Sequence, residues 1–180
     1  MFRFALIFWL VLQQPVPTGV PGPKRVEAPR ELIQAAEKGD VGKIRDFSQH
    51  PGFGNADTKG RTALLVAGEK GQKAAFAEII TIVNERTRKE ALRVPHEGQD
   101  AVEDLMKAVQ ARMSFFNAAD KKGQTPLMHA ARRGWDDLVR FLLDGGATPD
   151  NRDTDGRSAA DYADKAGYRA LASTLREQTK

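Results

Sequence analysis

Three histidines and no cysteine limit the chemistry that this chain of 180 residues could perform. His50, His96 and His129 lie far apart in the sequence, and none belongs to a His-x-x-x-His pair that could hold a metal ion on one helix face. The lack of cysteine excludes disulfides, thiolate zinc sites and a cysteine nucleophile. We therefore expect neither a metal ion nor another cofactor.

No other residue type stands in a recognisable catalytic pattern. None of the four serines has the glycine-flanked setting of a strained nucleophile, and Ser158 suits a helix cap instead. The chain has no glycine-rich phosphate loop. Most acidic residues lie in turns or at helical spacing from a basic residue, as Glu85 does from Lys89. The residue types thus favour a protein that binds rather than one that catalyses.

The elements that would position these side chains are repeated along the chain. One eight-residue pattern occurs four times, at Leu32–Gly39, Leu64–Gly71, Leu127–Gly134 and Ala160–Gly167. The closing glycines are 32, 63 and 33 residues apart, and three of the four copies follow an Asp-x-x-Gly turn that begins at Asp57, Asp120 or Asp153. A period near 33 with a turn, a helix start, small residues and a closing glycine resembles the ankyrin repeat. The resemblance covers residues 30–178 and implies an all-α solenoid of about four helix-turn-helix repeats that binds proteins.

Each recurring position also has a physical reason. An Asp side chain closes a turn by accepting hydrogen bonds from amides that follow it, and glycine supplies positive φ. Thr125 can cap a helix that starts with Pro126, where the missing N–H costs nothing. Ser158 and Asp161 have the spacing of a capping box. The ankyrin pattern usually places His directly after Thr-Pro-Leu, but Met128 occupies that place here.

The spacing of 63 leaves about 30 residues more than one period requires. Apolar residues recur at helical spacing from Phe76 to Val83 and again from Val102 to Phe116, and Pro95 separates the two runs. The stretch is either a degenerate repeat or a helical insertion. We favour a helical insertion near 85–119, between the second and third recognisable repeats, because residues 95–98 make a poor Asp-x-x-Gly turn. The four repeats then lie near 30–56, 57–84, 120–152 and 153–178.

The N-terminus has the pattern of a secretory signal peptide. Arg3 precedes nine apolar residues, Phe4–Leu12, which rise only about 14 Å as a helix against a bilayer core of roughly 30 Å. We assign residues 1–20 to the signal and 21–29 to a proline-rich linker, although no Ala-x-Ala motif fixes the cleavage site. The chain is then exported, periplasmic or secreted. The alternative is an uncleaved N-terminal segment that anchors it.

In such a stack the turn tips and the exposed side of the first helices would contact a partner. These positions carry nine Lys or Arg against three Asp or Glu, whereas the whole chain has 28 against 24. The candidate protein-binding residues are Lys59, Arg61, Lys70, Lys121, Lys122, Gln124, His129, Arg132, Arg133, Trp135, Arg157, Tyr162 and Lys165. We expect His129 to be exposed, Tyr162 to be an aromatic contact, and Trp135 to be either a contact or packed beside Gly134.

The sequence therefore predicts a monomeric, noncatalytic scaffold that presents a basic concave face to an acidic protein partner. Nucleic acid is disfavoured as a partner, because stacking aromatic residues are sparse and the chain is expected to be exported. No membrane contact is expected beyond the signal segment. The alternative function is a hydrolase or other enzyme whose site is built on the helical insertion, where a deep pocket with converging polar groups would be the sign.

Overall fold

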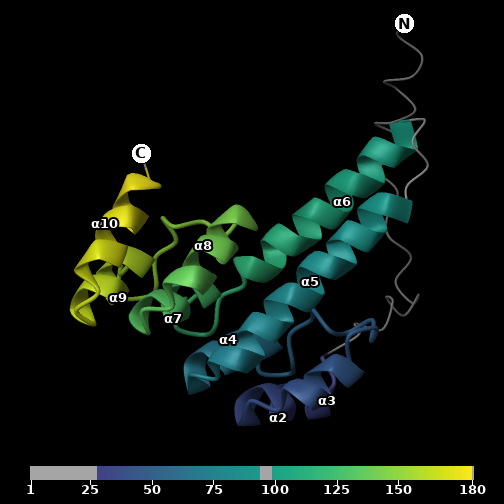
Figure 1. Ribbon diagram of the computed structural model, residues 1–180, viewed down its shortest axis with the longest axis horizontal. Helices are drawn as coiled ribbons and strands as arrows, with labels where there is room; N and C mark the ends of the chain where they lie inside the picture. Colours follow the sequence, from purple (N-terminus) through teal and green to yellow (C-terminus); the bar gives the residue numbers. More distant parts are fainter. Residues whose placement is uncertain (1–27, 94–98, 180) are drawn as a thin grey trace, which may run out of the picture.

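The computed structural model describes residues 28–93 and 99–179, which contain helices and turns but no strand. The predicted signal peptide, most of the linker and residues 94–98 lie outside these ranges. The helices are α2 (Arg30–Lys38), α3 (Val41–Asp46), α4 (Ala63–Lys70), α5 (Lys73–Arg93), α6 (Gln99–Phe116), α7 (Pro126–Arg132), α8 (Asp136–Asp144), α9 (Ala159–Lys165) and α10 (Arg169–Glu177) (Figure 1). The predicted all-α fold is confirmed.

The short first helices of the repeats form one continuous row. Helix α2 packs on α4, α4 packs on α7, and α7 packs on α9 (Figure 1). Alanine is buried at the equivalent place in the four helices, at Ala35, Ala67, Ala130 and Ala163. Because these side chains are small, consecutive helices approach closely and the backbone of each repeat lies against the next.

Local capping starts and ends these helices as the sequence predicts. The hydroxyls of Thr62 and Thr125 accept hydrogen bonds from the third amide of α4 and α7, and Pro126 is the first residue of α7. Ser158 and Asp161 form a capping box at α9. Helix α2 starts after Pro29 without a side-chain cap, as expected of a terminal repeat. The caps fix where each first helix begins, and hence where its turn projects.

The glycines that end the first helices are covered by the following repeat. Gly39, Gly71 and Gly134 have positive φ, and a Cβ atom on any of them would collide with a side chain of the next repeat. The covering side chains are, in that order, Gln72, Arg133 and Tyr168. Arg133 also donates from Nε to the Gly68 carbonyl (3.0 Å) and from Nη2 to the Glu69 carbonyl (2.8 Å). These contacts join neighbouring repeats in a chain that lacks the His after Thr-Pro-Leu.

Helices α5 and α6 form a long hairpin beside the row. Helix α5 runs 21 residues to Arg93, α6 returns alongside it, and α7 then packs directly on α4 (Figure 1). No complete repeat separates α4 from α7, so the packing suits an insertion, although the division of the chain into repeats stays an interpretation. Within residues 28–93 and 99–179, no helix is both long enough and apolar enough to cross a bilayer.

The close approach of α4 and α7 can be tested at Gly68. A Cβ atom there would lie 2.8 Å from His129 Cβ and 3.1 Å from Phe76 Cε2, so Gly68→Ala should destabilise the fold by about 1–3 kcal/mol in urea unfolding. Gly42 in α3 is the matched control, because its nearest neighbour would be Asp40 Oδ1 at 3.5 Å. Gly42→Ala should be neutral or stabilising by about 0.5–1 kcal/mol. Equal stability of the two variants would contradict the close packing.

Candidate protein-binding surface

A basic hollow of about 340 Å³ lies between the turns of the second and third repeats. Its lining has five basic side chains, two carboxylates and one amide: Lys59, Arg61, Lys121, Lys122, Arg132, Glu69, Asp120 and Gln124. Six of these eight residues were predicted from the sequence to contact a partner. The structure thus gathers much of the predicted set, although Glu69 and Asp120 in its lining were not on that list.

Two Asp-x-x-Gly turns hold the lysines of the basic hollow in place. Asp57 Oδ1 accepts from the amides of Lys59 and Arg61, both at 2.9 Å. Asp120 Oδ1 accepts from the amides of Lys122 (2.8 Å) and Gln124 (2.9 Å). The backbone is therefore fixed while the lysine side chains project from it. Lys59, Lys121 and Lys122 are exposed and form no ion pair with the residues that the structure describes.

Several other predicted contact residues are committed to bonds within the fold. Arg61 Nη2 lies 2.9 Å from Asp57 Oδ2, Arg157 Nη2 lies 2.8 Å from Asp153 Oδ2, and Lys70 Nζ lies 3.0 Å from Glu37 Oε1. Arg133 caps carbonyls of α4 and does not line the basic hollow. Lys165 is exposed at the end of α9, also outside the basic hollow. The number of basic residues counted from the sequence is therefore larger than the number whose charge is available to a partner.

The two predicted aromatic contacts are buried. Tyr162 is 6% exposed, because its hydroxyl donates to Asp153 Oδ2 and accepts from Gln124 Nε2, both at 2.6 Å. Burial of Asp153 opposes ionisation, but the hydrogen bonds from Tyr162 and Arg157 outweigh it and hold the pKa of that carboxyl well below its usual range. Trp135 is 9% exposed, and its ring packs edge-on against the Phe76 ring with 5.3 Å between the ring centroids. For Tyr162 the expectation of an exposed aromatic contact is wrong, and for Trp135 the packing interpretation is confirmed.

His129 is buried, so the expectation that it is exposed is wrong. Only 2% of the residue is accessible, because Gly68 leaves room for its Cβ atom against α4. Its Nδ1 lies 3.4 Å from Arg132 Nη2, and its Nε2 lies 3.8 Å from Asp120 Oδ2 without a hydrogen-bond partner among the described residues. The imidazole therefore lies beneath the basic hollow, between two of its lining residues. The signal in the sequence was Gly68, which replaces an alanine in the small-residue pair of α4.

Burial also changes the ionisation of this imidazole. Removal from water and the positive charge of Arg132 lower the pKa of His129 to about 4, while Asp120 opposes the shift. His129 is therefore neutral in the folded protein at pH 7. With one ring nitrogen facing a guanidinium group, the imidazole accepts at Nδ1 and carries its proton on Nε2.

This shift predicts a pH dependence of stability. The unfolded chain binds a proton at His129 below about pH 6.5, whereas the folded chain resists protonation until about pH 4, so stability falls as the pH drops through this window. The loss should total about 3 kcal/mol between pH 7 and pH 4. His129→Leu should remove that part of the pH dependence in urea unfolding measured at half-unit steps. A variant with the same pH profile as the parent chain would refute the assignment.

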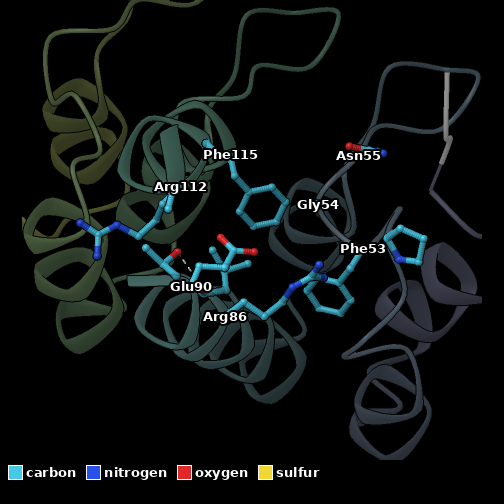
Figure 2. A pocket seen from close by; sticks show the side chains of 12 residues that line it. Phe53, Gly54, Asn55, Arg86, Glu90, Arg112 and Phe115 are labelled. Carbon is cyan, nitrogen blue, oxygen red and sulfur yellow. Dashed lines mark hydrogen bonds between the residues drawn. The ribbon is translucent and has the colours of Figure 1, made fainter. Parts of the chain in front are cut away.

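A second cleft, of about 200 Å³, lies between residues 51–55 and the α5–α6 hairpin (Figure 2). This is where the alternative enzyme site was expected. The Arg86 guanidinium lies over the Phe53 ring, with Cζ 5.8 Å from the ring centroid, and its Nη1 donates to the His50 carbonyl (3.2 Å). Glu90 supplies a carboxylate to the lining. Among the described residues of this lining, Glu90 has no second carboxylate, histidine or serine beside it with which to form a pair for acid–base hydrolysis.

Residues 93–180 match a family model described as ankyrin repeats (3 copies). An ankyrin repeat protein of Neisseria meningitidis serogroup B is 26% identical over 98 residues, which are 54% of this chain and 39% of that protein. The ARF GTPase-activating protein GIT1 of Homo sapiens is 40% identical over 67 residues, which are 37% of this chain and 8% of that protein. The chain thus spans less than half of the length of either relative.

The fold has a counterpart among solved structures. A chain in the crystal structure of the yeast ribosomal protein Rps3 in complex with its chaperone Yar1 superposes with a TM-score of 0.57 and 21% sequence identity. The match covers 82% of this chain and 89% of that chain. At this level of identity the likeness concerns the fold alone, and it extends over more of the chain than the family model does.

Proposed function

Because this chain belongs to the ankyrin-repeat family, whose repeats form scaffolds for protein–protein interaction, we propose that it binds an acidic surface of a partner protein through the basic hollow. The observation that carries the proposal is the convergence of Lys59, Lys121, Lys122 and Arg132 on one hollow of about 340 Å³. Turns of two different repeats supply the lysines, and rigid backbone bonds hold both turns. The site is therefore organised before a partner arrives, which lowers the entropy cost of binding.

The two carboxylates of the basic hollow refine the expected partner. Glu69 and Asp120 interrupt the positive charge, so a continuous polyanion would meet repulsion at two points. A protein surface with separated Asp or Glu side chains can pair with the lysines and avoid both carboxylates. Ion pairs at such an exposed site depend on the salt concentration. The proposal thus predicts tighter capture of the partner at low ionic strength.

Charge reversal at Lys121 and Lys122 tests this function. The double variant Lys121→Glu/Lys122→Glu should weaken binding of an acidic peptide of alternating Glu and Ser at least about tenfold, a loss of about 1.4 kcal/mol, as measured by calorimetry in low salt. Its stability should be almost unchanged, because both side chains are exposed and unpaired within the described structure. Arg133 is unsuitable for this test, since its reversal would also break the bonds to α4.

The control is an equal change of charge elsewhere. Arg88 and Lys89 are also adjacent and exposed, but they lie on α5 outside the basic hollow. Arg88→Glu/Lys89→Glu should bind the acidic peptide within about twofold of the parent chain, since both pairs alter the net charge equally. Equal loss in the two double variants would show that net charge matters and that the basic hollow does not.

We further propose that the chain is exported, on the basis of Arg3 and the apolar run Phe4–Leu12. Fractionation of cells followed by N-terminal sequencing tests this proposal. The expected product begins shortly after Thr18 or Gly19 and is found in the periplasm or the medium. A full-length product in the cytosol would refute export, and a full-length product in the membrane fraction would support the uncleaved anchor.

A further inference from the structure

Helix α6 exposes a stripe of large apolar side chains. Leu105 and Met113 are each 42% exposed and Met106 is 66% exposed, so three of the six large apolar residues exposed in the described chain lie on this one helix. Single apolar residues on a surface are common, but a contiguous group marks a contact surface. Val109 continues the stripe, which follows helical spacing from residue 105 to residue 113.

The stripe forms one wall of a groove of about 740 Å³, here called the α6 groove. Asn117, Thr148 and Asn151 line its other side. Asn117 Nδ2 donates to the Gly146 carbonyl (2.8 Å), and its Oδ1 accepts from the Thr148 amide (2.7 Å) and from Asn151 Nδ2 (3.1 Å). One side chain therefore ties the end of α6 to the segment after α8, so the groove is formed by bonded elements.

The charges around the α6 groove are opposite to those of the basic hollow. The part of the groove lining that the structure describes has no charged side chain. The segments beside the groove, residues 103–104 and 144–152, carry four exposed carboxylates, Glu103, Asp104, Asp144 and Asp150, and one exposed arginine, Arg152. Lys107 on α6 is paired with Glu103 (2.9 Å) and Asp104 (3.5 Å), Arg112 on α6 lines the other cleft, and Arg152 donates to the Gly156 carbonyl (2.7 Å). In a chain with a net charge of +4, this apolar groove thus has an acidic border.

We propose that the α6 groove binds an amphipathic helix of a partner protein, with an apolar face flanked by Lys or Arg. The four apolar residues extend about 12 Å along α6, which corresponds to two turns of a docked helix with anchors at i, i+4 and i+7. The acidic side chains beside the groove favour a partner helix whose apolar face is flanked by Lys or Arg. Methionine at two of the four positions suits such a groove, because its unbranched side chain adapts to the shape of the bound face.

An extended strand suits this site less well than a helix. The amide and carbonyl groups of α6 are bonded within the helix, so the groove offers no strand edge to an extended peptide. A helix satisfies its own backbone and needs only apolar contact from the groove. The proposal goes beyond the function of the basic hollow and does not rest on it, since the two sites have no lining residue in common.

The experiment uses the full chain and a labelled helical peptide of 18 residues with leucine along one face and lysine at both ends, followed by fluorescence anisotropy. Met106→Ser should weaken binding at least about tenfold. Leu92→Ser is the matched control, because Leu92 is also 66% exposed but lies on α5 outside the groove. It should bind within about twofold of the parent chain. A peptide of the same design with glutamate ends should bind at least about tenfold more weakly than the lysine-ended peptide.

Other outcomes would overturn the proposal. If the lysine-ended and glutamate-ended peptides bind equally, the acidic border does not select the partner. If Met106→Ser and Leu92→Ser weaken binding equally, the peptide does not bind in the α6 groove. Self-association in sedimentation velocity that Met106→Ser abolishes would assign the groove to a second copy of this chain. Binding to phosphatidylglycerol vesicles that the same variant abolishes would assign it to lipid. Met106→Ser should leave binding of the acidic peptide unchanged, so failure here is distinguishable from failure of the basic hollow.

Discussion

The close approach of consecutive first helices is the constraint on which the rest of this structure depends. Buried alanines in α2, α4, α7 and α9 allow it, and Gly68 brings α4 against the Cβ atom of His129. The glycines that end α2, α4 and α7 are covered by side chains of the following repeat, so each of these repeats has its surface completed by the next one. The basic hollow exists because the turns at Asp57 and Asp120 are brought together by the same packing, although 63 residues separate them in sequence.

Features determined by neighbouring residues could be predicted from the sequence, and features determined by packing between repeats could not. The cap at Thr125, the capping box at Ser158 and the turn at Asp120 depend on bonds that span at most four residues. Burial of His129 depends on Gly68, about 60 residues away, and the bonds of Arg133 depend on carbonyls of α4. A basic residue read as a contact for a partner can therefore be a contact within the fold, and only the three-dimensional arrangement distinguishes the two.

Part of the predicted set of binding residues lies together in the structure, and other members of the set are paired within the fold. Lys59, Lys121, Lys122 and Arg132 share one hollow, whereas the charges of Arg61 and Arg157 are largely neutralised by the aspartates of their own turns. The Asp-x-x-Gly motif explains this difference in physical terms. An arginine four residues after the turn aspartate can reach its carboxylate, whereas a lysine at the tip points away.

The α5–α6 hairpin has a consequence for how this protein can diverge. The chain leaves the row of first helices after α4 and rejoins it at α7, and these two helices still pack on each other. Whole turns could be gained or lost at the distal end of the hairpin during evolution without shifting any repeat against its neighbour. The length and the surface residues of the distal end of the hairpin could therefore change without any change in the row of first helices. The first helices themselves must keep their small residues in order to pack closely.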